Sequence, residues 1–297
     1  VKSVVVSEGF DCVSIMSQIQ QELAAWNYDN AMELATKVES AFKSGRAIDK
    51  LILPGILILL ARVYINRVET KRRDSAPHVK RAKALLKQAE EMLGADDSDR
   101  FAEIWALKAS LESLENGPDA ALTLLEGRVD PYAVRSRVAL LLNQTKTIEA
   151  LQVIQELEPH ERWCDVAVTA YSLNDRFDKA RAIVTWAASL PNRSRFPQCA
   201  VCMANALMAR SLVEHGASKN IHPQDISERE RKGLEEVLDV LHPVLGVIKV
   251  AERPTSELDM RALGIAWQAN HLLQRREEVV VLMGLMASWT PVPVEVG

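Results

Sequence analysis

The chain has 297 residues, of which 48% are hydrophobic and 26% are charged, and its formal net charge is −4. This composition is that of a folded globular protein, and 12 glycines with 12 prolines are too few for an all-β protein with many hairpins. The slightly acidic balance argues against a general nucleic-acid binder. Four cysteines in so long a chain favour reduced thiols and a cytoplasmic location over a disulfide framework.

The longest apolar run, residues 51–61, is too short to span a bilayer and predicts a buried helix instead of a membrane insertion. The chain opens on Val1 instead of methionine, so we expect further sequence, such as a leader or another domain, to precede it. The predicted organisation is an extended tail, a helical region and a second tail: residues 1–11, 12–290 and 291–297.

Apolar and small residues recur at spacings of three, four and seven along most of the chain, which is the period of one helical face. In chain order, one set of these stripes occupies residues 57–64, 105–112, 134–141, 164–171 and 263–270. A second set begins at Ala31, Ala82, Ala121, Ala150, Ala180, Gly233 and Val279. Helix breakers such as Asp130-Pro131 and Pro191 separate the resulting pairs. The repeating unit is therefore helix, turn, helix, breaker, and the fold class is all-α.

The segment from Cys164 to Pro191 resembles a repeat of the tetratricopeptide (TPR) family, with Tyr171, Phe177 and Ala180 in the family's register. The turn that precedes Ala180 has a counterpart in residues 26–31. The resemblance implies a right-handed αα-superhelix of about seven helix pairs. It also implies a concave groove, lined by the first helix of each pair, that holds a peptide or a partner protein.

The spacing of the second-helix stripes varies around the 34 residues that the TPR family uses. The longer steps predict additional residues at 69–78 and 212–228, inside the second and sixth pairs. A basic run at 71–83 falls partly in the first of these segments. We interpret this run as a solvated face, with contact to an acidic partner or a phosphate backbone as the alternative.

Ten polar residues are predicted to face the groove. Arginine grips carboxylates with two parallel hydrogen bonds, and asparagine or glutamine pairs with backbone amides in both directions. The alternative is that these positions are simply the solvated sides of their helices. The three arginines expected to contribute most project from first helices: Arg135, Arg162 and Arg261. The full set is Arg62, Asn66, Arg135, Asn143, Arg162, Thr169, Asn205, Arg261, Gln268 and His271.

Cys199 and Cys202 form a CxxC pair, but Cys164 and Cys12 are isolated in sequence and no His pair lies nearby. No strand precedes the pair, as a thioredoxin-like redox site would require. We therefore predict that both cysteines are small core residues, and we expect neither a metal nor a cofactor.

Arg210 and His215 match the R-x4-H pattern of helical HEPN ribonucleases, in which these side chains act at the scissile phosphate. The same pattern also occurs at Arg73 and His78, which shows how readily chance supplies it. The sequence thus favours a non-catalytic interaction scaffold. The alternatives are a regulatory domain that senses a ligand or peptide and, with less support, a ribonuclease.

Overall fold

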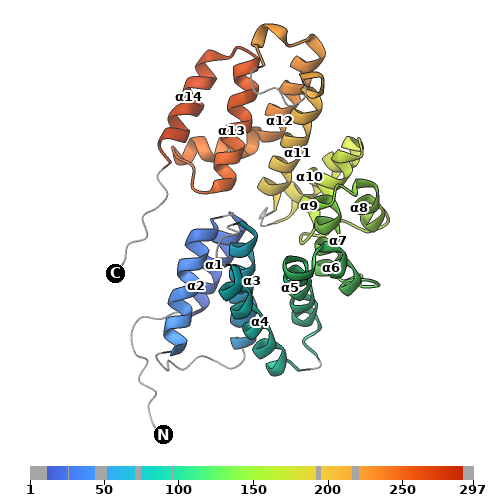
Figure 1. The fold of residues 1–297 in the computed structure, drawn as a ribbon. Coiled ribbons are helices and arrows are strands. Elements are labelled where there is room, and N and C mark those ends of the chain that lie inside the picture. The colour runs from blue at the N-terminus through green and yellow to red at the C-terminus, as the bar shows by residue number, and fades with distance from the viewer. Residues whose placement is uncertain are drawn as a thin grey trace. The chain divides into compact units, whose positions relative to one another are not determined.

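The computed structural model describes residues 12–25, 27–43, 52–70, 75–94, 96–191, 195–215 and 221–289 (Figure 1). Within these ranges every regular element is helical, with fourteen α-helices, two short 3-10 helices and no strand. The all-α prediction is confirmed. The predicted tails, residues 1–11 and 291–297, lie outside the described residues.

The chain divides into two compact units, of which unit 1 is Val1–Leu124 and unit 2 is Leu125–Gly297. The helices of unit 1 are α1 (Cys12–Ala24), α2 (Tyr28–Lys43), α3 (Leu53–Thr70), α4 (Ser75–Met92), α5 (Ser98–Asn116) and α6 (Pro118–Leu124). Each helix packs against the next one, and α3 also contacts both α1 and α5. Helix α3 is therefore the centre of unit 1.

The sequence of α3 fits this central place. Pro54 lies in its first turn, where a missing backbone N–H breaks no helical hydrogen bond. The following six residues, 56–61, are all buried, because neighbouring helices cover several of their faces. The prediction of a buried helix in this run is confirmed. None of the described helices is long and apolar enough to cross a membrane.

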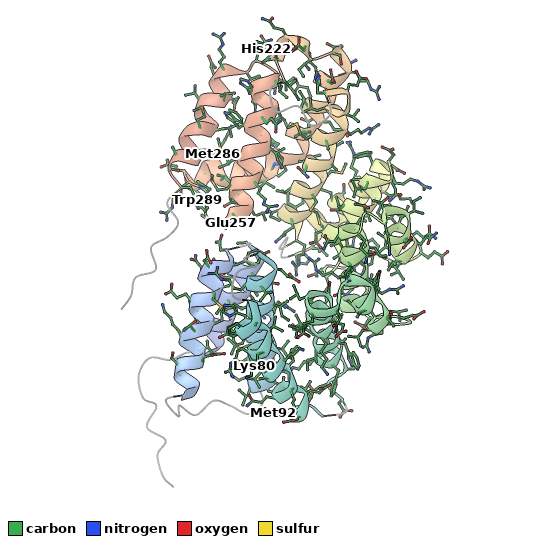
Figure 2. The ribbon with its side chains drawn as sticks, viewed as in Figure 1. Lys80, Met92, His222, Glu257, Met286 and Trp289 are labelled. Carbon is green, nitrogen blue, oxygen red and sulfur yellow. The ribbon has the colours of Figure 1, made fainter. Side chains whose placement is uncertain are left out.

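The helices of unit 2 are α7 (Pro131–Asn143), α8 (Thr147–Ile154), α9 (Cys164–Leu173), α10 (Phe177–Ser189), α11 (Phe196–Ser211), α12 (Glu228–Ala251), α13 (Glu257–Leu272) and α14 (Arg276–Ala287). The segment between α11 and α12 holds the 3-10 helices η1 (Val213–His215) and η2 (Pro223–Asp225). The long connection expected at 212–228 is confirmed for its described part. Helices α13 and α14 form a hairpin. Figure 2 shows Glu257, at the start of α13, at the same end of the α13–α14 hairpin as Met286 and Trp289.

One tight turn recurs in unit 2, between α7 and α8, α9 and α10, and α13 and α14. Its centre is a residue in the left-handed region: Thr145 (φ 61°), Asp175 (φ 56°) and Gln274 (φ 61°). The next backbone N–H donates to the carbonyl five residues earlier, at 2.9 Å in all three turns. The turn between α1 and α2 has the same bond, from Asn27 to Glu22, at 2.8 Å. The repeat predicted from the side chains is therefore also present in the backbone.

The small residues that mark each second helix lie at helix crossings. Ala31, Ala150 and Ala180 are fully buried, each four residues after the N–H that closes its turn. Gly233 of α12 lies against Ser211 of α11, where an added Cβ would lie 2.1 Å from the Ser211 Oγ. A larger side chain at these positions would push two helices apart.

Three details of the predicted pattern are wrong. Most of 69–78 is not an insertion, because α3 continues to Thr70 and α4 begins at Ser75. The stripe predicted for α5 at Trp105, Lys108, Ala109 and Glu112 is buried only at Ala109, and the buried residues also include Ile104 and Leu107. The stripe predicted to run from Val279 to Met283 and Met286 in α14 is wrong, because Leu282 is buried and Met283 is exposed. Both helices carry apolar residues on several faces, so their sequences do not select a single register.

Candidate partner-binding surface

The odd-numbered helices of unit 2 form a continuous row. Helix α7 contacts α9, α9 contacts α11, and α11 contacts α13, in addition to the contact of each with the next helix in sequence. Most predicted groove residues of this unit lie on the row. We call the following set the odd-helix surface: Arg135, Asn143, Thr169, Asn205, Arg261, Gln268 and His271.

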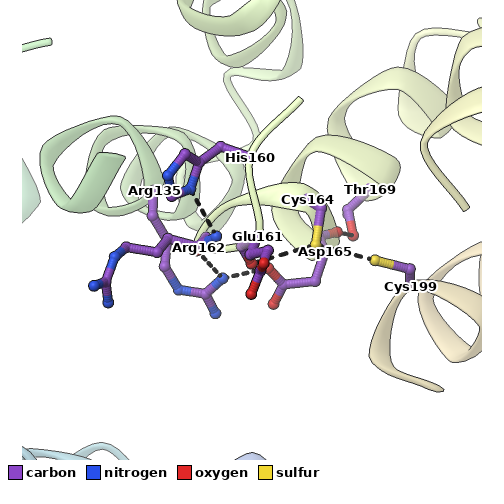
Figure 3. Close-up of polar contacts among 8 residues, drawn as sticks. All are labelled: Arg135, His160, Glu161, Arg162, Cys164, Asp165, Thr169 and Cys199. Atoms are coloured by element: carbon purple, nitrogen blue, oxygen red, sulfur yellow. Dashed lines mark hydrogen bonds and ion pairs between the residues drawn. The ribbon is translucent and has the colours of Figure 1, made fainter. Parts of the chain in front are cut away.

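Arg135 of α7 is held by a carboxylate of the next odd helix (Figure 3). Its guanidinium is hydrogen-bonded to Asp165 of α9, and it also donates to the carbonyl of Arg162 at 3.0 Å. The Asp165 side chain is only 12% exposed, whereas that of Arg135 is 38% exposed. Burial is the largest single cause acting on Asp165 and raises its pKa. The charge and hydrogen bond of Arg135, together with the charge of Arg195 and a hydrogen bond from the Val166 backbone, lower that pKa on balance.

Arg162 does not project from a helix, as had been expected, because it lies in the turn that precedes α9. Its guanidinium lies 3.9 Å from the centre of the Tyr132 ring, an arrangement typical of a cation–π contact. Its backbone N–H donates to His160 Nδ1 at 3.1 Å. Trp163, next in sequence, is buried and places this turn against the core. Arg162 therefore stabilises the entry to α9 from outside the row.

The remaining members of the odd-helix surface face solvent to different degrees. Asn205 of α11 is exposed, and Thr169 of α9 is half-buried and donates to the carbonyl of Asp165 at 3.2 Å. Asn143 is exposed at the end of α7. On α13 a polar stripe of exposed side chains comprises Glu257, Arg261, Gln268 and His271.

His271 stacks on Trp267 of the same helix, with the ring centres 5.6 Å apart and the planes at 10°. His271 and Gln268 are exposed, and Trp267 is half-buried. Arginine, amide and aromatic groups of this kind are enriched where proteins bind peptides.

The two predicted groove residues of unit 1 lie on α3. Arg62 is ion-paired with Glu103 of α5, and Asn66 is half-buried. Arg62 therefore links two helices of its own unit. The part of the basic run that is described also pairs internally, since Arg81 contacts Glu39 at 2.9 Å and Lys83 contacts Glu115 at 2.7 Å. These contacts are consistent with a solvated, ion-paired face.

Arg210 and His215 have separate partners. The Arg210 guanidinium lies 4.5 Å from the centre of the Phe177 ring, and His215 Nε2 lies 3.1 Å from a carboxylate oxygen of Glu230. Glu230 is buried and forms a capping box with Ser227 at the start of α12. In the second R-x4-H match, Arg73 lies outside the described residues. His78 stacks on Tyr64 with ring centres 5.5 Å apart. All of these contacts have a packing role.

The cysteines of unit 2 are closer together than the sequence indicates. Cys199 of α11 donates to Cys164 of α9, with the two sulfur atoms 3.4 Å apart, and both residues are fully buried. The prediction that the CxxC cysteines are core residues is confirmed for Cys199, and Cys202 is half-buried. The interpretation of Cys164 as isolated is wrong, because helix packing brings α9 against α11.

Within the described ranges, no group of three or more His, Cys, Asp or Glu side chains could hold a metal ion. The residue that sequence reasoning undervalued is Asp165. Asp165 lies between Cys164 and Ala167, both buried, in a helix whose other residues are mainly apolar. An acidic residue at such a position in the sequence could have indicated a buried carboxylate that needs a charged partner. A comparison with known proteins adds nothing to this geometry, since no family model and no curated protein matches the chain.

Proposed function

We propose that the chain is a non-catalytic protein-interaction scaffold of the TPR type, which binds a peptide or partner protein on the odd-helix surface. The observation that carries the proposal is the row of α7, α9, α11 and α13, in which each odd-numbered helix contacts the next. In a right-handed stack of about seven helix pairs, such a row lines the concave side, where extended partners bind.

The recurring turn supports the same architecture. Thr145, Asp175 and Gln274 each have a backbone in the left-handed region, and the N–H of the next residue donates to the carbonyl five residues before it. Because the same turn gives each hairpin a similar angle, successive pairs stack with a similar offset. A stack of this kind buries the apolar stripes between pairs and leaves the odd-numbered helices exposed on one side.

The chemistry of the surface favours a polypeptide partner with acidic groups. Arg261 provides a guanidinium that can take a carboxylate in a bidentate grip. Asn205 and Gln268 can donate to and accept from backbone amides, and both are exposed. Arg135 is ion-paired with Asp165, so its partly exposed guanidinium has N–H donors that are already oriented before a partner arrives.

The proposal is tested by site-specific photo-crosslinking during affinity capture from an extract of the source organism. A photoreactive phenylalanine analogue replaces Asn205 or Gln268 in one set of proteins. In the control set it replaces Gln152 of α8 or Lys179 of α10, which are equally exposed but lie on even-numbered helices. We expect the same partner to crosslink from the first set and not from the second.

Equal crosslinking from Gln152 and Lys179, or crosslinking from these positions alone, would contradict the assignment of the surface. Peptide mapping of the crosslinked product would then identify the helices that do make the contact. Turnover of RNA that is lost on substitution of Arg210 and His215 together would contradict the non-catalytic assignment.

A further inference from the structure

Three thiols gather where α9 packs on α11. Cys164 is the first residue of α9, whereas Cys199 and Cys202 lie one turn apart on α11. The sulfur atoms of Cys164 and Cys199 are 3.4 Å apart, although the two residues are 35 positions apart in sequence. A disulfide requires about 2.0 Å between sulfur atoms, so a closure of about 1.4 Å would join them.

We propose that Cys164 and Cys199 are an oxidation site, at which a small peroxide produces a disulfide that joins α9 to α11. Both sulfur atoms are buried, so a partner on the odd-helix surface does not contact them directly, although Arg135 of that surface acts on the charge of Cys164. The proposal therefore does not depend on the identity of a binding partner.

The surroundings assign different roles to the three thiols. The hydrogen bond from Cys199 is the largest cause and, with the charges of Arg195 and Arg135, lowers the pKa of Cys164 against the opposing effects of burial and of the Asp165 charge. Burial is the largest cause that raises the pKa of Cys202, to about 11. At neutral pH Cys164 is therefore the thiol with the greatest thiolate character, and the thiolate is the reactive form. Its place at a helix N-terminus favours the same charge.

The reaction is balanced with hydrogen peroxide as the oxidant. The sulfur of Cys164 attacks one peroxide oxygen, the O–O bond breaks, and the products are a sulfenic acid and one water molecule. The sulfur of Cys199 then displaces the sulfenic hydroxyl, so an S–S bond forms and a second water molecule leaves. The two thiols together lose two protons and two electrons, and the peroxide is reduced to two water molecules.

Burial determines which oxidants can act. Both cysteines are fully buried, so the oxidant must be small enough to reach the sulfur atoms through local fluctuations of the packing of α9 on α11. We expect hydrogen peroxide to react faster than oxidised glutathione. We also expect a low, non-denaturing concentration of urea to accelerate the reaction, because it increases the population of the locally opened state.

The test uses the full chain with Cys12→Ser, which removes the cysteine of unit 1. The protein is treated with hydrogen peroxide, the remaining thiols are alkylated, and peptides are mapped by mass spectrometry without reduction. We expect a crosslinked peptide that joins residues 164 and 199, alkylation of Cys202, and reversal by dithiothreitol. We also expect the Tm of unit 2 to rise by about 5–10 °C, because the bond restricts the unfolded chain.

Matched variants separate the two chemical steps. Cys202→Ser should leave the crosslink unchanged. Cys199→Ser should abolish it and leave a sulfenic acid on Cys164 that dimedone labels. The proposal is overturned if Cys202 enters the crosslink, or if all three thiols survive peroxide in the native protein. Both of these overturning outcomes are measured in protein that retains Cys164 and Cys199, so the test remains decisive even if Cys199→Ser fails to fold.

Discussion

In unit 1 the central helix α3 is covered by neighbours and buries a continuous apolar run, whereas in unit 2 the central helix α9 also buries Asp165 and Ser172. Of the buried polar side chains in the described residues, Glu39 lies in unit 1. Unit 2 contains the others: Asp165, Ser172, Gln198, Glu230, Ser256 and Asn270. Both units are thus built from packed helix pairs, but unit 2 buries more polar side chains among its described residues than unit 1 does.

The difference teaches where specificity is located. Apolar burial stabilises unit 1 without selecting particular partners, since it is non-directional. A buried charge such as Asp165 costs free energy unless it is paired, so it requires Arg135 in one geometry. Unit 2 therefore pairs a buried aspartate between two odd-numbered helices. In unit 1 one buried carboxylate, Glu39, is paired with Arg81, whereas the pair of Lys83 and Glu115 is exposed.

The largest expected effect is on the apolar centre of unit 1. Leu60 of α3 is fully buried, and Leu60→Ala should lower the free energy of unfolding of unit 1 by about 2–5 kcal/mol through lost burial and a residual cavity. Leu114→Ala on α5, where the leucine is 38% exposed, is the control and should cost much less. Urea denaturation with hydrogen exchange measures both. Equal costs would contradict the buried position of Leu60.

The second prediction addresses the buried charge of unit 2. Arg135→Ala leaves the Asp165 carboxylate without its principal partner and should destabilise unit 2 by about 2–3 kcal/mol, a value reduced for the exposure of the arginine. Lys83→Ala, which breaks the exposed pair with Glu115 in unit 1, should cost less than about 1 kcal/mol. Denaturant titration of both variants compares them. Similar losses would show that the two ion pairs do not differ.

A third prediction tests the helix crossing in unit 2. Ala180 is fully buried, so Ala180→Leu should overpack α10 and cost about 1–3 kcal/mol. Ala182→Leu makes the same change two residues away on the exposed side of α10 and should be close to neutral. Thermal unfolding followed by circular dichroism distinguishes them. If Ala182→Leu proves the more damaging variant, the register of α10 is wrong.

The smallest expected effect is on acid stability. The pKa of Asp165 is lower in the folded state than in the unfolded chain, so its stabilisation is fully present above pH about 4. This stabilisation is lost progressively as the pH falls from about 4 through the folded pKa, because the unfolded chain takes up the proton before the folded state does. Asp165→Asn should flatten the acid dependence of unit 2. Glu230, whose pKa is lowered by hydrogen bonds from Ser227, contributes to the slope that remains. An unchanged acid profile would contradict the role of Asp165.

The fold was largely predictable because helical periodicity is a local property of the sequence. The stripe that includes Ala150 and Ile154 needs only its own spacing to identify a helix and its buried side, and both residues are fully buried. The turn at Asp175 is also local, since aspartate tolerates the left-handed region better than most residues. Registers were wrong where apolar residues occur on several faces, as around Met283.

The candidate site was less predictable because it depends on contacts between distant residues. Arg135 and Asp165 are 30 positions apart, and nothing in either segment alone indicates that they pair. Cys164 and Cys199 likewise meet through the packing of α9 on α11. Sequence spacing therefore identified polar positions on the helices. It did not reveal that Arg135 is oriented by a buried carboxylate, or that Arg162 belongs to a turn.

The most direct test of the proposed function compares two charge reversals in unit 2 for binding of the captured partner. Arg261→Glu changes the exposed stripe of α13, whereas Arg229→Glu makes the same change on the even-numbered helix α12, where Arg229 is also exposed. Isothermal titration should show at least tenfold weaker binding for Arg261→Glu, about 1.4 kcal/mol, and unchanged affinity for Arg229→Glu, with the Tm of both proteins preserved. Equal affinity of the two variants, or a greater loss for Arg229→Glu, would contradict binding on the odd-helix surface.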